Sequence, residues 1–374
     1  MPDHEVVIVG AGPVGLLLAC LLVQDGVDVV VCERRAAADP RTRAIGIHRP
    51  GLDALDAVEL GPSVRREALR LDGGDVISRG RTLASLTFTS DRPVLVLPQQ
   101  QTDALLRERL RLLSPAALLS GHAVRTVRDE GPFVRISVHT GDGVREITGA
   151  LVVAADGVRS ARREELGIAW RPRAGSGAYA MADAADLSGD RRARLYCEPD
   201  GLVESFPLPA GRRRWVVRQG STGAEPVTAA AFLAVVEART GVRPDVPDEM
   251  APSVFDAAQH TARSHGRGRV VLLGDAQHEI SPIGGQGMNL GWMDAVHLAE
   301  RIVRDRDRGS YDFRGYGRRT RRSARVAQRR SAFYMSMGRP SNGIPLAARD
   351  GLIRLLGSRP LRRASAGLIT MRGI

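Results

Sequence analysis

The N-terminal stretch contains the pattern that most constrains the fold of this chain. An apolar run, Val6–Val9, leads into Gly10-x-Gly12-x-x-Gly15 and a helix-forming apolar stretch, and a second run, Val27–Val31, ends at Glu33. A strand, a glycine turn, a helix, a strand and an acidic residue about twenty positions later form a unit that binds adenine dinucleotides. Its first glycine makes the tight turn, the second lets a pyrophosphate approach, and the third lets the helix pack on the sheet. The pattern predicts an α/β domain with ribose hydroxyls bound at Glu33, but it does not distinguish NAD from FAD.

A second stretch, residues 269–299, predicts a ligand-binding turn of another kind. A buried strand, Val270–Leu273, is followed by Gly274-Asp275, a Pro- and Gly-rich loop, and a helix that starts at about Met288. Glycines let the backbone approach a flat ligand, and the free N–H groups of a helix N-terminus favour anionic oxygens. We expect Asp275, at the end of the strand, to accept hydrogen bonds from sugar-type hydroxyls.

The rest of the chain alternates between strand-like and helical patterns. Residues 151–155 predict another buried strand, which ends at Asp156-Gly157, and residues 167–259 predict an antiparallel lobe that also contains a helix. Strands are expected at 81–89, 94–97, 178–182, 194–197, 202–206 and 214–218, a hairpin or three-strand meander at 121–149, and helices at 51–60, 102–113, 227–240, 311–330 and 346–356.

Composition argues against several classes of protein. The net charge is +12, but the chain has no Lys, its Arg residues are spread widely, and only 4% of residues are aromatic. We therefore expect a positive field that attracts anionic cofactors or substrates, and no nucleic-acid partner. Three scattered cysteines, Cys20, Cys32 and Cys197, favour neither a disulfide framework nor a metal site, and a reducing cytoplasm is the default location. No segment is long enough to cross a membrane, and we expect a monomer or homodimer.

Three motifs together resemble the FAD-dependent aromatic hydroxylases, the flavoprotein monooxygenases typified by para-hydroxybenzoate hydroxylase. The motifs are the glycine fingerprint with Glu33, Asp156-Gly157-x-x-Ser160-x-x-Arg163, and Gly274-Asp275-Ala276-x-His278 with its Pro/Gly loop, which Asp294-Ala295 continues into the next helix. Gln277 stands where the family usually has Ala. The resemblance covers roughly residues 4–330 and is thin in the stretch 167–259.

The resemblance implies an α/β fold with a Rossmann-like FAD-binding domain, an inserted antiparallel β-sheet lobe for the substrate, and C-terminal helices. It divides the chain into an FAD-binding domain (1–72, 98–166 and 260–330), a substrate lobe (73–97 and 167–259) and a C-terminal helical segment (331–374). The additional thioredoxin-like domain of some relatives is not expected.

The resemblance also implies which residues contact the cofactor. Gln99 is favoured over Gln101 for a flavin-facing position because Pro98 precedes it. The full set is Gly10, Gly12, Pro13, Gly15, Glu33, Arg34, Arg43, Gln99, Val124, Asp156, Gly157, Asp275, Pro282, Gly285, Gly287, Met288 and Asn289.

The chemistry implied is monooxygenation. NADPH or NADH reduces FAD transiently, O2 forms a flavin C4a-(hydro)peroxide, and one oxygen atom is transferred to an aromatic or polyketide-like small molecule. Alternatives that share the flavin are epoxidation, Baeyer–Villiger insertion and a reductase of the geranylgeranyl type. A non-catalytic FAD- or NAD-binding protein, and a nucleic-acid binder without flavin, are alternatives from other classes. Trp292 does not reproduce the tryptophan motif of flavin halogenases, so halogenation is disfavoured.

No side chain is identified as catalytic from the sequence. A base that draws off a phenolic proton would assist hydroxylation. His48, Tyr196, Glu204 and Arg218 are candidates by position only, and an ordinary structural role is the simpler interpretation of each.

Overall fold

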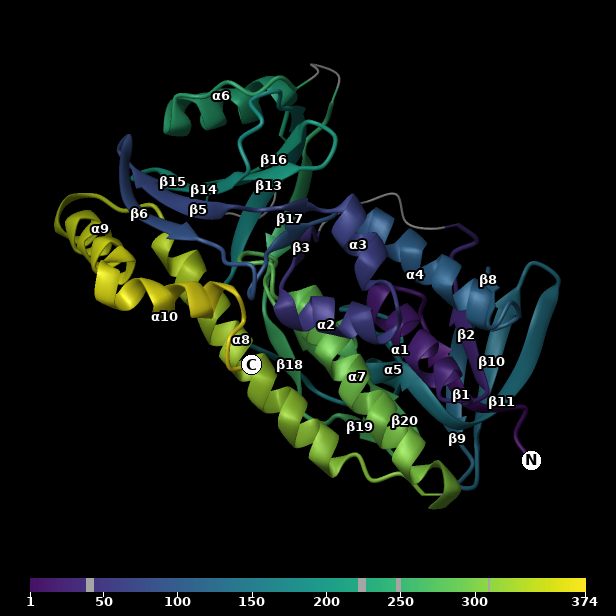
Figure 1. Cartoon of the computed structure of the whole chain (residues 1–374). Helices are drawn as coiled ribbons and strands as arrows, with labels where there is room; N and C mark the ends of the chain where they lie inside the picture. Colours follow the sequence, from purple (N-terminus) through teal and green to yellow (C-terminus); the bar gives the residue numbers. More distant parts are fainter. Residues whose placement is uncertain (38–43, 221–226, 247–249, 309) are drawn as a thin grey trace.

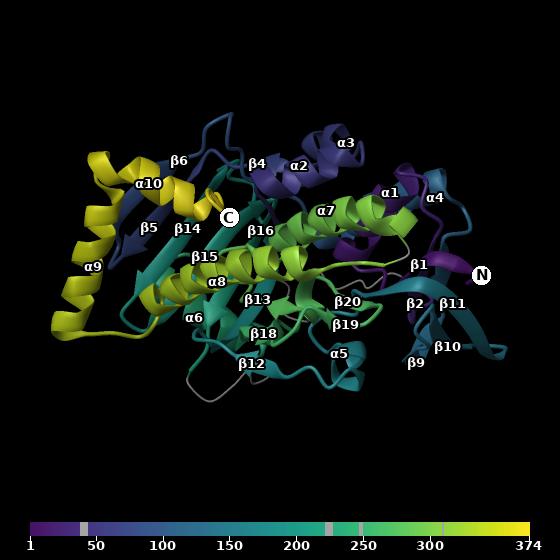
Figure 2. The same cartoon turned by 90° about the horizontal axis from the view of Figure 1, so that it is seen from below.

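The computed structural model describes residues 1–37, 44–220, 227–246, 250–308 and 310–374 of the chain (Figure 1). Two large sheets occupy opposite ends of the molecule. Helices α7 (Gly287–Asp305) and α8 (Arg314–Met337) pack against each other, and α8 extends from the first sheet toward the second (Figures 1 and 2).

The first sheet is the α/β domain predicted from the N-terminal pattern. Its order is β19-β20-β11-β1-β2-β8, in which β20, β11, β1, β2 and β8 run parallel, and β10 and β9 extend it antiparallel from β11. The strands are β1 (His4–Val9), β2 (Val29–Glu33), β8 (Leu118–Ser120), β9 (Ala123–Asp129), β10 (Val134–Thr140), β11 (Gly143–Ala154), β19 (Gly266–Arg267) and β20 (Val270–Leu272). Strands of a parallel sheet are covered on both faces. β2 is accordingly buried along its whole length, and its sequence is a nearly continuous apolar run.

The second sheet has seven strands in the order β17-β13-β16-β15-β14-β5-β6. The strands are β5 (Gly73–Ser78), β6 (Arg81–Thr87), β13 (Gly177–Ala185), β14 (Arg192–Glu198), β15 (Gly201–Leu208), β16 (Arg212–Arg218) and β17 (Ser253–Ala257). Only the β5–β14 pair is parallel. One face of the sheet packs against α6 (Ala229–Thr240), through a cluster that includes Tyr196, Trp215 and Phe232.

Two small three-stranded sheets lie outside these two. They are β3 (Gly46–Ile47), β7 (Leu95–Val96) and β4 (Leu69–Arg70), and β12 (Trp170–Pro172), β18 (His260–Ala262) and β21 (His278–Glu279). The remaining helices are α1 (Pro13–Gln24), α2 (Arg49–Ala57), α3 (Gly61–Glu67), α4 (Gln99–Leu113), α5 (Ala161–Glu165), α9 (Gly343–Gly357), α10 (Arg359–Ile369) and the short η1 (Gly274–Ala276) and η2 (Arg306–Arg308).

Several helix boundaries differ from the sequence-based expectation. α4 begins at Gln99, three residues before the expected start, because its first turn is polar and adds nothing to the leucine periodicity. α8 continues seven residues past Arg330, and α10 lies within the expected C-terminal helical segment 331–374, although the sequence did not predict a separate helix there. α10 has a proline in its first turn, a position where proline favours a helix start, but its Arg-rich sequence lacks a strong apolar pattern.

The C-terminal helices cover the face of the second sheet that lies opposite α6 (Figure 1). Asp350 of α9 accepts hydrogen bonds from Ser78 (3.2 Å) and from the Arg79 guanidinium (2.9 Å). Arg349 donates to the backbone carbonyls of Met337 and Cys197. These polar contacts fix α9 against the sheet.

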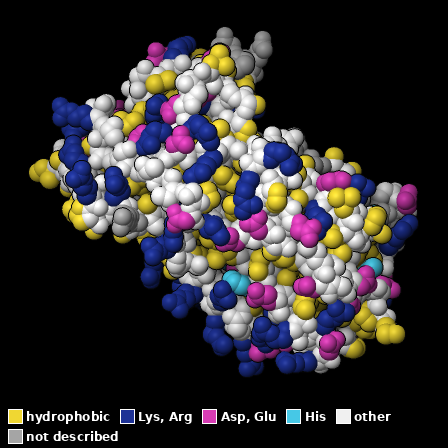
Figure 3. Space-filling model, viewed as in Figure 1, with side chains coloured by type: hydrophobic (Ala, Val, Ile, Leu, Met, Phe, Trp, Pro, Cys, Tyr) yellow, Lys and Arg dark blue, Asp and Glu magenta, His cyan; other side chains and the backbone are white. Residues whose placement is uncertain are grey.

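Arginine side chains gather along the edge of the molecule where α8 lies (Figure 3). Arg318, Arg322, Arg325 and Arg329 are exposed there, at spacings of three and four residues that place them on one face of the helix. The clustering of positive charge is therefore a local feature of α8.

Candidate active site

The three motifs meet at one edge of the first sheet. Val9 of β1 pairs with Ala154 of β11, which pairs with Leu272 of β20, so these parallel strands end at the same level. The glycine fingerprint, Asp156-Gly157 and Gly274-Asp275 directly follow these three ends. The carboxyl edge of a parallel sheet is where α/β proteins bind ligands.

The three glycines of the fingerprint differ in what a side chain at their positions would meet. Gly10 has φ +108°, and a Cβ added there would lie 2.5 Å from the carbonyl oxygen of Ala155. A Cβ on Gly15 would lie 2.2 Å from the carbonyl oxygen of Gly10. A Cβ on Gly12 would meet nothing within 4 Å. Gly10 and Gly15 are thus required by packing, whereas Gly12 borders empty space at the start of α1, where a pyrophosphate would fit.

Glu33 closes the turn from the side of β2. One carboxylate oxygen accepts the N–H of Ala11 at 2.8 Å, and the other accepts the N–H of Arg35 at 2.9 Å. The carboxylate therefore holds the glycine turn, and each oxygen keeps a second lone pair for a ribose hydroxyl. The ribose contact stays a prediction.

Two arginines, Arg34 and Arg43, were predicted to contact the cofactor, and the structure describes one of them. Arg34 is exposed and does not line the cavity, whereas its neighbour Arg35 does. Arg43 lies outside the described residues. Arg107 of α4 also lines the cavity and donates to the carbonyl of Ala11 at 3.2 Å.

A cavity of about 660 Å³ runs from the glycine turn to the second sheet. Among the residues predicted to contact the cofactor, Gly12, Pro13, Gly15, Gln99, Gly157, Asp275, Pro282, Gly285, Gly287 and Met288 line it. Gly10, Glu33, Arg34, Val124, Asp156 and Asn289 are not part of its lining.

One face of α4 forms part of the cavity wall. Gln99, Asp103 and Arg107, spaced four residues apart, line the cavity, whereas Gln101 is exposed and does not. The prediction of Gln99 over Gln101 agrees with this placement. Asp103 and Arg107 were missed, although their spacing from Gln99 was a signal that could have identified them.

The Asp-Gly motif is built into a network of backbone contacts. One oxygen of Asp156 accepts the N–H of Arg162 at 3.2 Å, and the other is buried without a hydrogen-bond partner among the described residues. The Arg162 guanidinium donates to the carbonyl of Val124 at 3.0 Å, so Val124 contributes through its backbone. Arg163 donates to the carbonyls of Val158 (3.0 Å) and Ala276 (3.2 Å) and thus joins the Asp-Gly turn to the Gly-Asp turn.

Asp275 projects into the cavity. It is accessible from the cavity but enclosed by protein, and this burial raises the pKa of its carboxyl to about 6, although nearby His278 acts in the opposite direction. The neighbouring His278 is fully enclosed, with Nε2 2.5 Å from Oδ2 of Asp294. Burial lowers the pKa of His278, but the Asp294 carboxylate outweighs it and the pKa is raised. This pair connects the Gly-Asp turn to α7.

Asn289 supports the cavity without lining it. Its side chain binds the backbone of Gly46, His48 and Gly285, at 2.9, 2.9 and 3.0 Å. His48 lines the cavity, and burial lowers the pKa of its imidazole to about 4, so it is neutral at physiological pH.

The far end of the cavity is the face of the second sheet opposite α6. It is mostly apolar, with Met181, Leu195, Leu202, Phe206 and Val216 on the strands, and Tyr334, Ile353, Leu356 and Leu368 on α8, α9 and α10. The contribution of α9 and α10 was not predicted. Such an apolar wall suits a hydrophobic small molecule.

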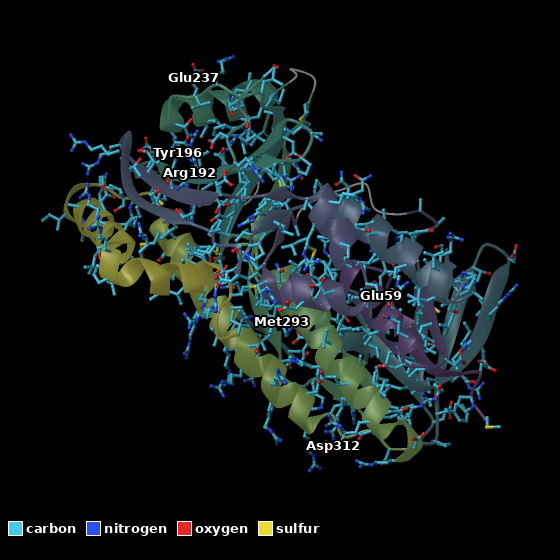
Figure 4. The ribbon with its side chains drawn as sticks, in the orientation of Figure 1. Glu59, Arg192, Tyr196, Glu237, Met293 and Asp312 are labelled. Carbon is cyan, nitrogen blue, oxygen red and sulfur yellow. The ribbon has the colours of Figure 1, made fainter. Side chains whose placement is uncertain are left out.

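Of the four candidate bases, two line the cavity and two do not. Tyr196 points to the opposite face of the sheet, stacks on Trp215 and lies beneath α6, so the candidate is wrong (Figure 4). Arg218 does not line the cavity; it donates to the Tyr179 hydroxyl and to the carbonyl of Met335, both at 3.3 Å. His48 and Glu204 do line it.

In the described parts of the chain, no helix has the length and apolar character needed to cross a membrane. Among those same residues, no group of three or more His, Cys, Asp or Glu side chains could hold a metal ion.

The fold and the three turns define a dinucleotide-binding α/β protein. The open space at Gly12, which lines the cavity, fits a ligand of this kind. A family model described as an FAD binding domain matches residues 3–311.

Known proteins similar to this chain are aromatic and polyketide monooxygenases. A 12-dehydrotetracycline 5-monooxygenase/anhydrotetracycline 6-monooxygenase from Streptomyces rimosus is 33% identical over 324 residues, which cover 80% of this chain and 62% of that protein. A para-nitrophenol 4-monooxygenase from a Pseudomonas species is 30% identical over 319 residues, which cover 80% of this chain and 77% of that protein. The solved structure of the Streptomyces rimosus anhydrotetracycline hydroxylase superposes with a TM-score of 0.81 at 29% identity, and covers 99% of this chain and 76% of that one.

The chain belongs to the FAD-dependent aromatic hydroxylase family of flavoproteins. The family and the fold class predicted from the three motifs are therefore confirmed, and FAD is the cofactor that the matched domain binds. This chain spans 62% of the length of the tetracycline-pathway relative that it matches.

Proposed function

We propose that this protein is an FAD-dependent monooxygenase that hydroxylates an aromatic or polyketide-like small molecule, with NADPH or NADH as transient reductant. The proposal is supported above all by one observation. A single cavity runs from the glycine turn at Gly12–Gly15, where a dinucleotide would bind, to the apolar face of the second sheet. The names of the relatives, which describe monooxygenases of tetracycline intermediates and of para-nitrophenol, agree with it.

The residues of the chain have separate roles in this proposal. The N-termini of α1 and α7 and the glycine turn would bind the anionic and carbonyl oxygens of FAD. Asp275 would accept hydrogen bonds from its sugar-type hydroxyls, and Pro282 would shape the space beside the ring. Bound FAD would supply the redox chemistry, because it accepts hydride from a reduced nicotinamide and activates O2. The apolar wall would exclude water and hold the substrate close.

The division into domains follows the same proposal. Residues 1–72, 98–166 and 260–330 would bind FAD, 73–97 and 167–259 would bind the substrate, and 331–374 would cover it. Deletion of 331–374 should then leave FAD binding largely intact and impair substrate binding.

The visible absorption spectrum of the purified protein tests the function. Flavin bands that bleach when NADPH or NADH is added without oxygen, and return with air, are the expected result. A protein that stays colourless after incubation with FAD would contradict the proposal. A screen of aromatic substrates, read by oxygen consumption and by the position of the added oxygen in the product, separates hydroxylation from epoxidation, Baeyer–Villiger insertion and reduction.

A further inference from the structure

Glu204 is a carboxylic acid in the middle of a mostly apolar cavity wall. It lies on β15, the central strand of the seven-stranded sheet, and its side chain lines the cavity. Only 4% of its surface is exposed.

The neighbours of Glu204 on this face are all apolar. Leu195 on β14 and Val216 on β16 pair with it across the strands, and Leu202 and Phe206 precede and follow it on the same face of β15. All four line the cavity. Side chains at such positions are direct neighbours on a sheet, so the carboxyl group is surrounded by hydrocarbon.

Among the residues that the structure describes, no side chain compensates this carboxyl. Arg214 lies on the same wall, opposite Phe206, but its guanidinium binds the carboxylate of Asp183 with distances of 2.6 and 2.9 Å. Among the described residues, Glu204 has no side-chain hydrogen bond and no ion pair. A buried polar group without a partner costs free energy, so its presence on a cavity wall points to a ligand that supplies the partner.

Glu204 is in a position to exchange a proton near neutral pH. Burial raises the pKa of its carboxyl to about 8. The titratable groups near it do not titrate in the same range, because burial raises the pKa of Tyr179 on β13, of Cys197 on β14 and of Tyr334 on α8 to about 12. Of the charged side chains on β13, β14, β16 and β17, Arg214 and Asp256 also line the cavity, and Arg214 is paired with Asp183.

We propose that Glu204 binds a hydroxyl group on the aromatic substrate and accepts its proton during the reaction. The assignment rests on the proposed function and names its substrate class: an apolar aromatic molecule with at least one hydroxyl. The substrate O–H bond breaks, its electron pair stays on the substrate oxygen, and the proton forms an O–H bond with the Glu204 carboxylate. The electron-rich oxygen then activates the ring toward an electrophilic oxygen atom, and a carboxylate of raised basicity suits this role.

A ligand pair that differs only in the hydroxyl tests the contact. Dissociation constants of 2-naphthol and naphthalene for the FAD-loaded protein, measured from the flavin spectrum without any reductant, are compared in wild type and Glu204→Leu. Loss of one hydrogen bond to a carboxyl should weaken 2-naphthol by about tenfold or more. Naphthalene, which has no hydroxyl, should bind Glu204→Leu at least as well as wild type.

The Glu204→Gln variant tests the proton transfer. Glutamine keeps the shape and the hydrogen-bonding ability but accepts no proton, so KM for 2-naphthol should change little while kcat falls. In wild type, kcat should rise with pH up to about 8 as the carboxyl ionises, and Glu204→Gln should lose this rise.

A matched control is Glu198→Gln. Glu198 is also a buried carboxyl with a pKa raised by burial, but it does not line the cavity, and it accepts the Arg79 N–H at 2.8 Å. This variant should keep the wild-type ratio of the two dissociation constants and the wild-type pH profile.

Two results would overturn the role of Glu204. One is equal loss of 2-naphthol and naphthalene binding in Glu204→Leu, or no response of the wild-type flavin spectrum to 2-naphthol. The other is an unchanged kcat and pH profile in Glu204→Gln. A failure of NADPH and NADH to bleach the flavin would instead count against the monooxygenase proposal, and the binding comparison, which needs no reductant, would still decide whether Glu204 contacts the hydroxyl.

Discussion

The amide of Asn289 at the start of α7 holds the backbone of His48, which lies 241 residues earlier in the chain. Its oxygen accepts the His48 N–H at 2.9 Å, and its nitrogen donates to the carbonyls of Gly46 and Gly285. One buried side chain thus ties the segment Gly46–His48 to the Pro/Gly loop that contains Gly285.

Replacing Asn289 should loosen this wall. Asn289→Ala leaves the His48 N–H and two carbonyls without their partner, which should lower the free energy of unfolding by about 2–4 kcal/mol, and weaken FAD binding. Gly51→Ala should act in the same direction, because its Cβ would lie 2.1 Å from the Asn289 side-chain oxygen. Urea denaturation measures both variants. Asn342→Ala is the control, since Asn342 is exposed and its side chain makes no capping hydrogen bond to α9.

Two glycines of the fingerprint should respond in opposite ways to the same substitution. Gly12→Ala adds a methyl group where nothing lies within 4 Å, so the protein should fold normally but bind FAD more weakly. Gly10→Ala forces a side chain onto φ +108° and against the carbonyl of Ala155, so the protein should fail to fold. Circular dichroism measures whether each variant folds, and flavin titration measures its FAD affinity. A Gly12→Ala protein with wild-type FAD affinity would mean that the pyrophosphate lies elsewhere.

Asp275 should make FAD binding depend on pH. Hydroxyl donors bind the carboxylate better than the neutral acid, and burial raises the pKa of Asp275 to about 6. FAD affinity should therefore rise as pH increases through about 6, and Asp275→Asn should remove that rise. Asp275→Ala should lower the affinity by about tenfold or more while the protein stays folded. Unchanged FAD affinity in Asp275→Ala would contradict its assignment.

His48 should reduce stability in acid. Burial lowers the pKa of its imidazole from 6.5 to about 4, although a backbone hydrogen bond at Gly284 partly offsets this. Between these values the unfolded chain binds a proton that the folded protein excludes, so stability falls as pH decreases from about 6.5 to about 4. His48→Gln should flatten this part of the stability profile in urea denaturation. His139→Gln, at an exposed position on β10, is the control and should leave the profile unchanged.

The three ligand-binding turns at the edge of the first sheet were predictable because their sequence signals are local. Strands that end in Gly10, in Asp156-Gly157 and in Gly274-Asp275 can be recognised from a few consecutive residues each. Parallel strands then bring their carboxyl ends together without any further information. The prediction of the family and fold class from these motifs was confirmed for this reason.

Other parts of the site depend on contacts between distant segments. The backbone conformation just after β2 determines whether Arg34 or its neighbour Arg35 faces the cavity. The sequence analysis predicted a cofactor contact for Arg34, whereas Arg35 lines the cavity. The candidate Tyr196 failed because the sequence does not show which face of a strand α6 covers when both faces are buried. The covering helix α9 is held by Arg349 and Asp350, whose partners lie on β5, on β14 and at the end of α8, and no local pattern encodes such contacts.

The alternation of side chains on β15 has a consequence for the evolution of this protein. Leu202, Glu204 and Phe206 face the cavity, while Val203 packs in the separate cluster beneath α6. Mutations at the cavity-facing positions can therefore change which molecules are accepted while the cluster beneath α6 keeps its composition. Such a division would let substrate preference change through substitutions that leave the packing beneath α6 untouched.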